Sequence, residues 1–171
     1  VTGVQTCALP ICVTKVGSNC LIMAYVHIAH DCEIGDNCII TNACQLAGEV
    51  VVDDFAIIGG MSAVHQFVHI GRHVMIQGGS LIGKDVPPYV KAGRLPLSYA
   101  GVNSIGLRRR GFVNEKINEI QDIYRILFQS GLNNSDAVER IEAEMPASKE
   151  RDEIIMFVRN SKRGVMKGYM G

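Results

Sequence analysis

The chain has 171 residues, with 17 basic and 17 acidic side chains and a formal net charge of zero. This length allows one domain or two small ones, and the balanced charge removes the usual electrostatic argument for a nucleic-acid partner. No apolar run approaches the roughly 18 residues that a membrane-spanning helix needs, so we expect no transmembrane segment. The charges are nevertheless uneven, because residues 86–114 and 156–171 contain basic but no acidic side chains. Such segments indicate either solvated surface or contacts with an anionic substrate and an acidic partner.

Residues 1–12 read VTGVQTCALPIC and do not follow the pattern that begins after them. Pro10 stands where that pattern would require an aliphatic residue. The stretch resembles a translated sequencing-adapter or cloning sequence. We therefore expect a non-native lead and leave it out of the fold prediction.

A six-residue repeat dominates the next part of the chain. From Val16 to Ile82 every sixth residue is a branched aliphatic, twelve in succession, and the residue four places after each is small. This period fits neither a helix nor a strand, and it is typical of the left-handed parallel β-helix, whose triangular coils contain three hexads. Glycine directly follows the aliphatic in five hexads, where we expect corners with unusual backbone dihedrals. Residues 13–88 are thus predicted to form about four coils of 18 residues.

Four of the six cysteines fall in the small-residue position of the repeat, namely Cys20, Cys32, Cys38 and Cys44. A thiol in that position acts as a small hydrophobic group. The sequence has no CxxC pair, and we recognise no secretion signal ahead of the repeat. Reduced, metal-free cysteines in a cytoplasmic protein are therefore the expectation.

The repeat ends at Pro87-Pro88, because two prolines cannot continue a strand ladder. We expect residues 89–105 to form an irregular connector and residues 106–171 to form a small all-α domain. Its first helix contains Ile117–Leu127 and closes at Gly131, and a second covers residues 136–144. A third begins after Ser148, a favourable N-cap, and runs to about residue 162.

Residues 18 apart should stack in neighbouring coils, so the repeat itself predicts columns of side chains. One column contains His30, Gly48 and Gln66, with Asp31 next to His30. A histidine oriented by a carboxylate suits general-base chemistry, and a glycine N–H in the neighbouring coil suits a developing oxyanion. The alternative is a histidine that is simply hydrogen-bonded on a solvent-facing surface.

Several segments together resemble one enzyme family, the acyl-ACP:UDP-N-acetylglucosamine O-acyltransferases that start lipid A synthesis. The segments are VHIAHDCEIGDNC, LAGEVVVDDFAIIGG, HVMIQGG, KDVPPYV and GVNSIGLRRRGF. The resemblance runs from about residue 13 to the C-terminus. It implies a cytoplasmic homotrimer of left-handed β-helices with C-terminal helices and active sites between subunits. It also implies transfer of a 3-hydroxyacyl chain from acyl carrier protein to the 3-hydroxyl of UDP-N-acetylglucosamine, with no cofactor or metal.

The resemblance also implies roles for individual residues. The catalytic set is the general base His30, its orienting partner Asp31 and the oxyanion donor Gly48. Residues implied near the substrate are His27, His65 and Gln66 at the sugar, and Asn103 and Arg109 at the nucleotide. Met75 and Gly78 fall at the implied acyl-chain groove, where a glycine would leave room for a longer chain.

The chain departs from the family in two ways. Glu49 stands where better-studied members have a histidine beside the oxyanion glycine. The family also has further N-terminal coils that this sequence lacks, so it reads as the C-terminal part of an enzyme. Outside the family motifs, His69 and His73 fall in outward positions of the repeat, and we expect both on the surface.

Three alternatives remain open at this point. The first is the later N-acyltransferase of the same pathway, against which the HIAHDC and GLRRRGF segments argue. The second is a γ-class carbonic anhydrase-like protein, a trimeric β-helix with zinc held by three histidines between subunits. The third is a non-catalytic structural fragment.

Overall fold

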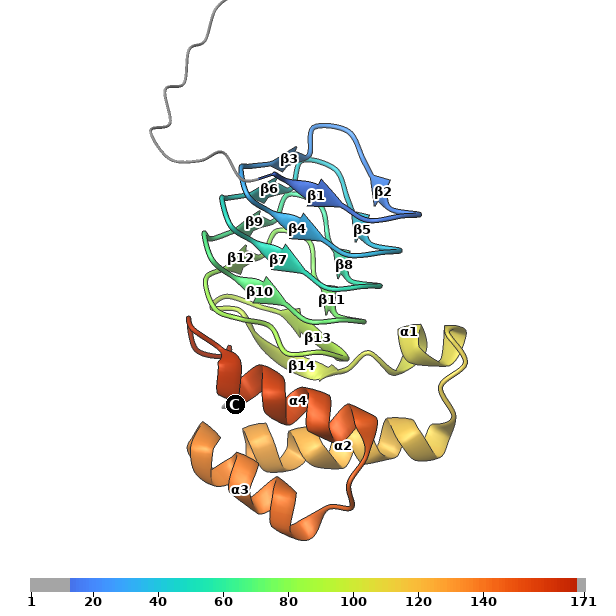
Figure 1. Cartoon of the computed structure of the whole chain (residues 1–171), viewed down its shortest axis with the longest axis vertical. Helices are drawn as coiled ribbons and strands as arrows, with labels where there is room; N and C mark the ends of the chain where they lie inside the picture. The colour runs from blue at the N-terminus through green and yellow to red at the C-terminus, as the bar shows by residue number, and fades with distance from the viewer. Residues whose placement is uncertain (1–12, 169–171) are drawn as a thin grey trace, which may run out of the picture.

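The computed structural model describes residues 13–168, with the repeat at one end and the helices at the other (Figure 1). The expected lead, residues 1–12, lies outside the described residues. Each of the twelve hexads contributes one strand of two residues. These strands are β1 Lys15–Val16, β2 Leu21–Ile22, β3 His27–Ile28, β4 Glu33–Ile34, β5 Ile39–Ile40, β6 Gln45–Leu46, β7 Val51–Val52, β8 Ile57–Ile58, β9 Ala63–Val64, β10 His69–Ile70, β11 Met75–Ile76 and β12 Leu81–Ile82.

The strands stack into three parallel sheets that form the faces of a prism. The first sheet is β1-β4-β7-β10, the second contains β2, β5, β8 and β11, and the third is β3-β6-β9-β12. In the first three coils each strand pairs with the one 18 residues further on, as in Val16 with Ile34 and Ile28 with Leu46. The predicted coil length and the parallel β-helix of about four coils are confirmed. We call the three edges 1–2, 2–3 and 3–1 after the sheets that meet there.

The interior of the prism is filled by the two residues that define the repeat. Ile40, Leu46 and Ile58 are fully buried, and Cys32, Cys38 and Cys44 beside them are buried free thiols. Val16 and Ile22 in the first coil are 47% and 40% exposed because they lie at the end of the stack. Cys20, also in the first coil, is a free thiol that is only partly buried. The core position predicted for the cysteines is therefore confirmed, and it is incomplete only in the first coil.

The turns at the edges depend on glycine differently from our expectation. The left-handed backbone conformation falls on every sixth residue from Asn19 to His73, with φ between 56° and 66°, and these residues are not glycines. The glycines that follow the aliphatics are not in that conformation, so the prediction for them was wrong. Four of the five leave room for the neighbouring coil instead: a Cβ on Gly35 would lie 2.8 Å from the amide nitrogen of Asp54, and one on Gly71 2.5 Å from that of Pro88. The fifth, Gly83, has no atom within 4 Å of its Cβ position.

The segment expected to be an irregular connector contains two strands. Strand β13 (Val90–Gly93) pairs in parallel with β11, and β14 (Ser98–Val102) pairs antiparallel with β13. They extend the second sheet to the order β14-β13-β11-β8-β5-β2. The prolines interrupt the six-residue period, but the chain re-enters the sheet directly after them.

Four helices follow among the described residues: α1 Ser104–Arg109, α2 Asn114–Gln129, α3 Asn134–Glu144 and α4 Lys149–Asn160. The three longer helices match the predicted ones, including the Ser148 N-cap, whose hydroxyl accepts a hydrogen bond from the Arg151 amide. We did not predict α1. No helix among these residues is both long enough and apolar enough to cross a bilayer.

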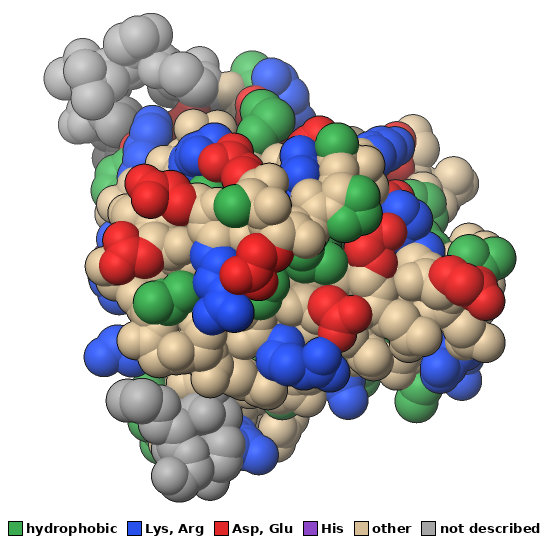
Figure 2. Space-filling view, turned by 90° about the horizontal axis from the view of Figure 1, so that it is seen from below, with side chains coloured by type: hydrophobic (Ala, Val, Ile, Leu, Met, Phe, Trp, Pro, Cys, Tyr) green, Lys and Arg blue, Asp and Glu red, His purple; other side chains and the backbone are tan. Residues whose placement is uncertain are grey.

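The helices pack across the C-terminal end of the prism. The Tyr124 hydroxyl of α2 donates to the Pro88 carbonyl oxygen at 2.6 Å, and the Tyr89 hydroxyl donates to the Glu153 carboxylate of α4 at 2.5 Å. Residues after α4 return to the prism, where the Asp85 amide donates to the Gly164 carbonyl oxygen. Seen from this end, acidic and basic side chains alternate over the surface (Figure 2).

Candidate active site

The candidate catalytic residues lie on edge 3–1, in the turns that lead from the third sheet to the first. His30 follows β3, Gly48 follows β6 and Gln66 follows β9, so they occupy the same position in three successive coils. A Cβ on Gly48 would lie 2.5 Å from both Cε1 and Nε2 of His30. The imidazole therefore lies directly over the backbone of Gly48, and no other residue type fits there without displacing it.

Asp31 fixes the orientation of the imidazole. Its Oδ2 atom lies 2.8 Å from Nδ1 of His30, and the His30 side chain is 64% exposed. If Nδ1 carries the proton that this carboxylate accepts, Nε2 is left with a free lone pair. The second carboxylate oxygen of Asp31, Oδ1, is buried and has no hydrogen-bond partner among the described residues. The exposed His30 ring thus presents Nε2 as a basic nitrogen, while Asp31 orients the ring through Nδ1.

The amide of Gly48, a buried residue beside the His30 ring, has no hydrogen-bond acceptor among the described residues. Its carbonyl oxygen accepts a hydrogen bond from the Phe67 amide, and the neighbouring Glu49 amide donates to the His30 carbonyl oxygen. The Gly48 N–H itself has no acceptor within residues 13–168. A basic nitrogen and an unused N–H therefore lie next to each other in adjacent coils. Glu49 is exposed beside them.

The residues implied at the sugar lie near this edge. His27 is exposed on β3, three residues before His30. His65 is exposed in the turn after β9, and its Nδ1 atom lies 3.1 Å from the carbonyl oxygen of Gln66. The structure therefore gathers His27, His65 and Gln66 around the His30 column.

The residues implied at the nucleotide lie on a different edge of the same prism. Asn103 is 3% exposed, and its Nδ2 donates to the carbonyl oxygen of His73, in the turn of edge 1–2 after β10. Its Oδ1 accepts from the Gly106 amide and so caps α1. Arg109 is exposed at the end of that helix. One chain thus places the residues implied at the sugar and those implied at the nucleotide on two different edges.

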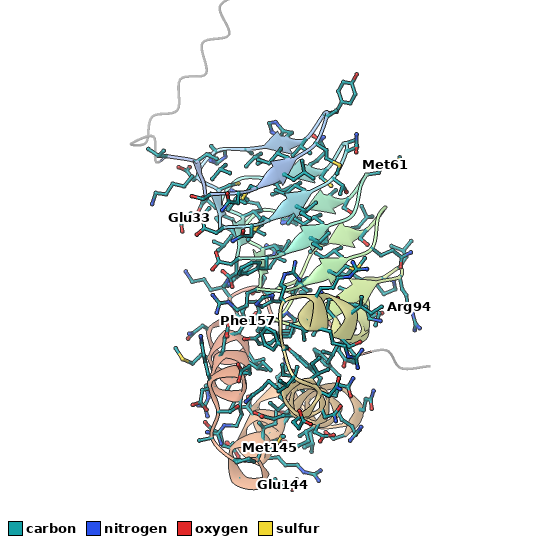
Figure 3. All side chains as sticks on the ribbon, turned by 90° about the vertical axis from the view of Figure 1, so that its right-hand side faces the viewer. Glu33, Met61, Arg94, Glu144, Met145 and Phe157 are labelled. Carbon is teal, nitrogen blue, oxygen red and sulfur yellow. The ribbon has the colours of Figure 1, made fainter. Side chains whose placement is uncertain are left out.

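Met75 and Gly78 lie in a third region, on β11 of the second sheet and in the turn at edge 2–3. Met75 is 44% exposed. A Cβ on Gly78 would lie 3.1 Å from the Gly60 carbonyl oxygen, so packing between coils already favours glycine there. Met61, in the turn one coil earlier, is 78% exposed and points away from the prism (Figure 3).

His73 differs from our expectation of a surface residue. It is 7% exposed, and its ring is stacked between Phe55, with centroids 4.9 Å apart, and Tyr89, at 5.6 Å. Burial, together with nearby Arg110 and Arg72, lowers the pKa of His73 to about 4. The sequence carried a signal for this cluster, because Phe55 stands one coil before His73 and Tyr89 follows the proline break. His69, in contrast, keeps a 40% exposed side chain, with Nε2 2.9 Å from Asp53 Oδ1.

Within the part of the chain that is described, no group of three or more His, Cys, Asp or Glu side chains could hold a metal ion. Burial raises the pKa of the Cys38 thiol to about 12.

Two family models match the chain. The model described as bacterial transferase hexapeptide repeats matches residues 14–48, and the model described as domain 2 of UDP N-acetylglucosamine O-acyltransferase matches residues 85–166. The chain thus combines hexapeptide repeats with a C-terminal segment that matches the domain 2 model.

Individual relatives agree with these models. A solved UDP-N-acetylglucosamine acyltransferase from Bacteroides fragilis is 54% identical with a TM-score of 0.86, over 87% of this chain and 58% of that one. One from Francisella novicida is 38% identical with a TM-score of 0.85, over 89% and 56%. The curated acyl-[acyl-carrier-protein]–UDP-N-acetylglucosamine O-acyltransferase of Myxococcus xanthus is 44% identical over 90% of this chain and 60% of its own length. The chain belongs to this O-acyltransferase family, and it spans about 60% of the length of the curated relatives it matches.

Proposed function

We propose that this chain carries the catalytic edge of an acyltransferase that acts on UDP-N-acetylglucosamine. The reaction moves a 3-hydroxyacyl chain from the thioester of acyl carrier protein to the 3-hydroxyl of the sugar, the first step of lipid A synthesis. The observation that carries the proposal is the His30 imidazole, oriented by Asp31 at 2.8 Å and packed against Gly48, whose N–H has no acceptor within residues 13–168. The relatives named for this reaction support the choice of substrates.

The chemistry is direct transfer without a covalent enzyme intermediate. Nε2 of His30 removes the proton of the sugar 3-hydroxyl as its oxygen attacks the thioester carbonyl carbon. Charge develops on the carbonyl oxygen, to which the Gly48 N–H donates a hydrogen bond. The carbon–sulfur bond then breaks, and the departing thiolate of the carrier protein takes the proton from the imidazolium. Asp31 holds the imidazole and stabilises its protonated form.

Assembly of the site calls for a second copy of the chain. His30 and its neighbours lie on edge 3–1, whereas Asn103 and Arg109 lie on edge 1–2. We propose a homotrimer in which edge 3–1 of one copy faces edge 1–2 of the next. His27, His65 and Gln66 would then contact the sugar, and Asn103 and Arg109 of the neighbouring copy the nucleotide. The exposed Arg108 and Arg109 fit an anionic substrate and an acidic carrier protein.

Two further parts of the proposal concern the acyl chain and the compartment. Met75 on the exposed face of β11 and Gly78 in the next turn would line the groove for the acyl chain. Reduced cysteines in the core fit a cytoplasmic enzyme. The proposed chemistry uses no cofactor and no metal.

The test measures acyl transfer from 3-hydroxyacyl carrier protein to UDP-N-acetylglucosamine. Because the chain spans 58% of the Bacteroides fragilis protein, it is assayed both alone and as a chimaera in which residues 13–168 replace the matching segment of that protein. We expect little or no activity from the chain alone, and activity from the chimaera that His30→Ala removes. A chimaera that folds and trimerises but transfers no acyl group would contradict the proposal.

A further inference from the structure

Arg110 joins the β-helix to the short helix that ends just before it. One terminal nitrogen of its guanidinium donates to the Phe55 carbonyl oxygen at 3.3 Å, and the other donates to the Gly106 carbonyl oxygen at 3.3 Å. The guanidinium carbon also lies 5.3 Å from the centroid of the Phe55 ring. One side chain thus binds a turn of edge 1–2 and the body of α1 at the same time.

Arg110 lies on a stack of three rings. Phe55, His73 and Tyr89 come from three successive levels of edge 1–2 and stack in that order. We call these three rings the aromatic stack. Phe112 meets His73 edge-on with centroids 5.3 Å apart, which brings the chain directly after Arg110 onto the same stack.

Helix α1 depends on such outside contacts. It has six residues, far fewer than the roughly 12 to 15 at which an isolated helix becomes even marginally stable. Its first anchor is Asn103, which bonds His73 and caps the helix, and its second is the fully buried Leu107. Arg110 is the third anchor and the one at the C-terminal end.

The three consecutive arginines have different surroundings. Nε of Arg108 donates to Asn114 Oδ1 at 3.0 Å, and Arg110 bonds the two carbonyls described above. The side chain of Arg109 is exposed and makes no hydrogen bond or ion pair within residues 13–168. Only Arg109 therefore keeps its full donor capacity for a ligand, and its direction depends on the helix that carries it.

We propose that Arg110 is a positioning residue, which holds α1 against the aromatic stack and thereby aims Arg109 at its ligand. The identification of this ligand as the nucleotide part of UDP-N-acetylglucosamine rests on the proposed function. Without Arg110 the last turn of α1 would fray, and Arg109 would be mobile in the unliganded protein. Binding of the nucleotide would then have to order this turn, which lowers the affinity.

The first test follows amide hydrogen exchange by mass spectrometry in peptides that cover residues 103–112 of the unliganded chain. The Leu107 and Phe112 amides donate to the Asn103 and Leu107 carbonyl oxygens, so their exchange reports on α1. Arg110→Ala should speed exchange there by about tenfold or more while the β-helix peptides stay unchanged. Arg108→Ala is the matched control, because it removes a neighbouring arginine with no contact to the aromatic stack. Should Arg110→Ala not fold, Arg110→Lys replaces it, since an amine cannot reproduce the two-carbonyl fork.

The second test is a double-mutant cycle on the affinity of the chimaera for UDP-N-acetylglucosamine, measured by calorimetry. Arg110→Ala should weaken binding on the order of tenfold, and the double variant Arg109→Ala, Arg110→Ala should bind no more weakly than Arg109→Ala alone. This non-additivity is expected only if Arg110 acts through Arg109.

The outcomes separate the two proposals. Unchanged exchange in residues 103–112, or additive losses that indicate direct contact between Arg110 and the nucleotide, would overturn the positioning role. No measurable binding, or an unaltered affinity in Arg109→Ala, counts instead against the proposed function, and the exchange experiment then decides alone whether Arg110 anchors α1.

Discussion

His73→Phe should make the stability of the protein less sensitive to acid. His73 is 7% exposed between the rings of Phe55 and Tyr89, its Nδ1 atom has no hydrogen-bond partner among the described residues, and its pKa is lowered to about 4. Phenylalanine keeps a ring in the stack and forfeits no hydrogen bond of Nδ1. It also tolerates the backbone, because Phe55 and Phe67 occupy the same position of the repeat at φ 61° and 66°.

The sign and size of the effect follow from proton linkage. In the unfolded chain the histidine has an ordinary pKa of about 6.5, so below that pH the unfolded state binds a proton that the folded state does not. Stability therefore falls as the pH drops from about 6.5 to about 4, and below that both states are protonated and the loss is complete. A difference of about 2.5 pH units at about 1.4 kcal/mol each gives a loss of about 3 kcal/mol.

The assay is urea unfolding followed by circular dichroism at pH 7, 6, 5 and 4. For each pH we take the difference in the free energy of unfolding between variant and parent. Any change in packing energy caused by phenylalanine is the same at every pH, so it does not affect how this difference varies with pH. That difference should shift by about 3 kcal/mol in favour of His73→Phe between pH 7 and pH 4. A pH-independent difference for His73→Phe would refute the argument that burial holds this imidazole neutral.

Further outcomes are expected at the site and in the core. In the chimaera, His30→Ala should lower kcat by about 10² to 10⁴ with a smaller change in KM, and Asp31→Asn should be milder because the imidazole remains; near-normal turnover of His30→Ala would remove it as the base. Gly48→Ala should lower kcat without unfolding the coil, since its Cβ would collide with the imidazole, and a crystal structure would show the ring displaced. Arg109→Ala should raise the KM for UDP-N-acetylglucosamine, and added salt should reproduce part of that defect in the parent. Cys38→Ala should change the free energy of unfolding by no more than about 1 to 2 kcal/mol, and Cys38 should resist alkylation until the protein unfolds, because its thiol is buried with a pKa raised to about 12; metal released by this variant would contradict the core assignment.

The part of the site that lies inside the repeat could be predicted from the sequence. Because each coil contains 18 residues, residues 18 apart in the sequence lie in equivalent positions of neighbouring coils. The sequence therefore predicts that His30 and Gly48 stack, and the structure confirms it. Asn103 and Arg109 lie outside the repeat, where no such arithmetic applies. Their place on edge 1–2 depends on long-range contacts such as the bond from Asn103 to His73, which no local pattern encodes.

The errors in the fold prediction have a similar cause. Strands β13 and β14 carry no repeat signal: β13 pairs with the edge of β11, and β14 then pairs with β13. His73 was expected on the surface because its position points outward in every coil. It is buried because Tyr89, Phe112 and Arg110 from the following segment cover it. A repeat pattern predicts which side chains of a coil point outward. It does not predict which of them are then covered by segments outside the repeat.

The stacking of His30 on Gly48 also sets how this site can change. The two residues occupy equivalent positions in adjacent coils, so their separation along the prism is one rise of the stack, about 4.8 Å. The backbone ladder fixes that rise: on either side of this turn the His27 amide donates to the Cys44 carbonyl oxygen, and the Glu33 amide to that of Val50. Equivalent positions on this edge are therefore separated by whole multiples of the rise per coil. Substitutions can change which side chain occupies a position, as with Glu49, but they cannot change the spacing between positions by a fraction of a coil.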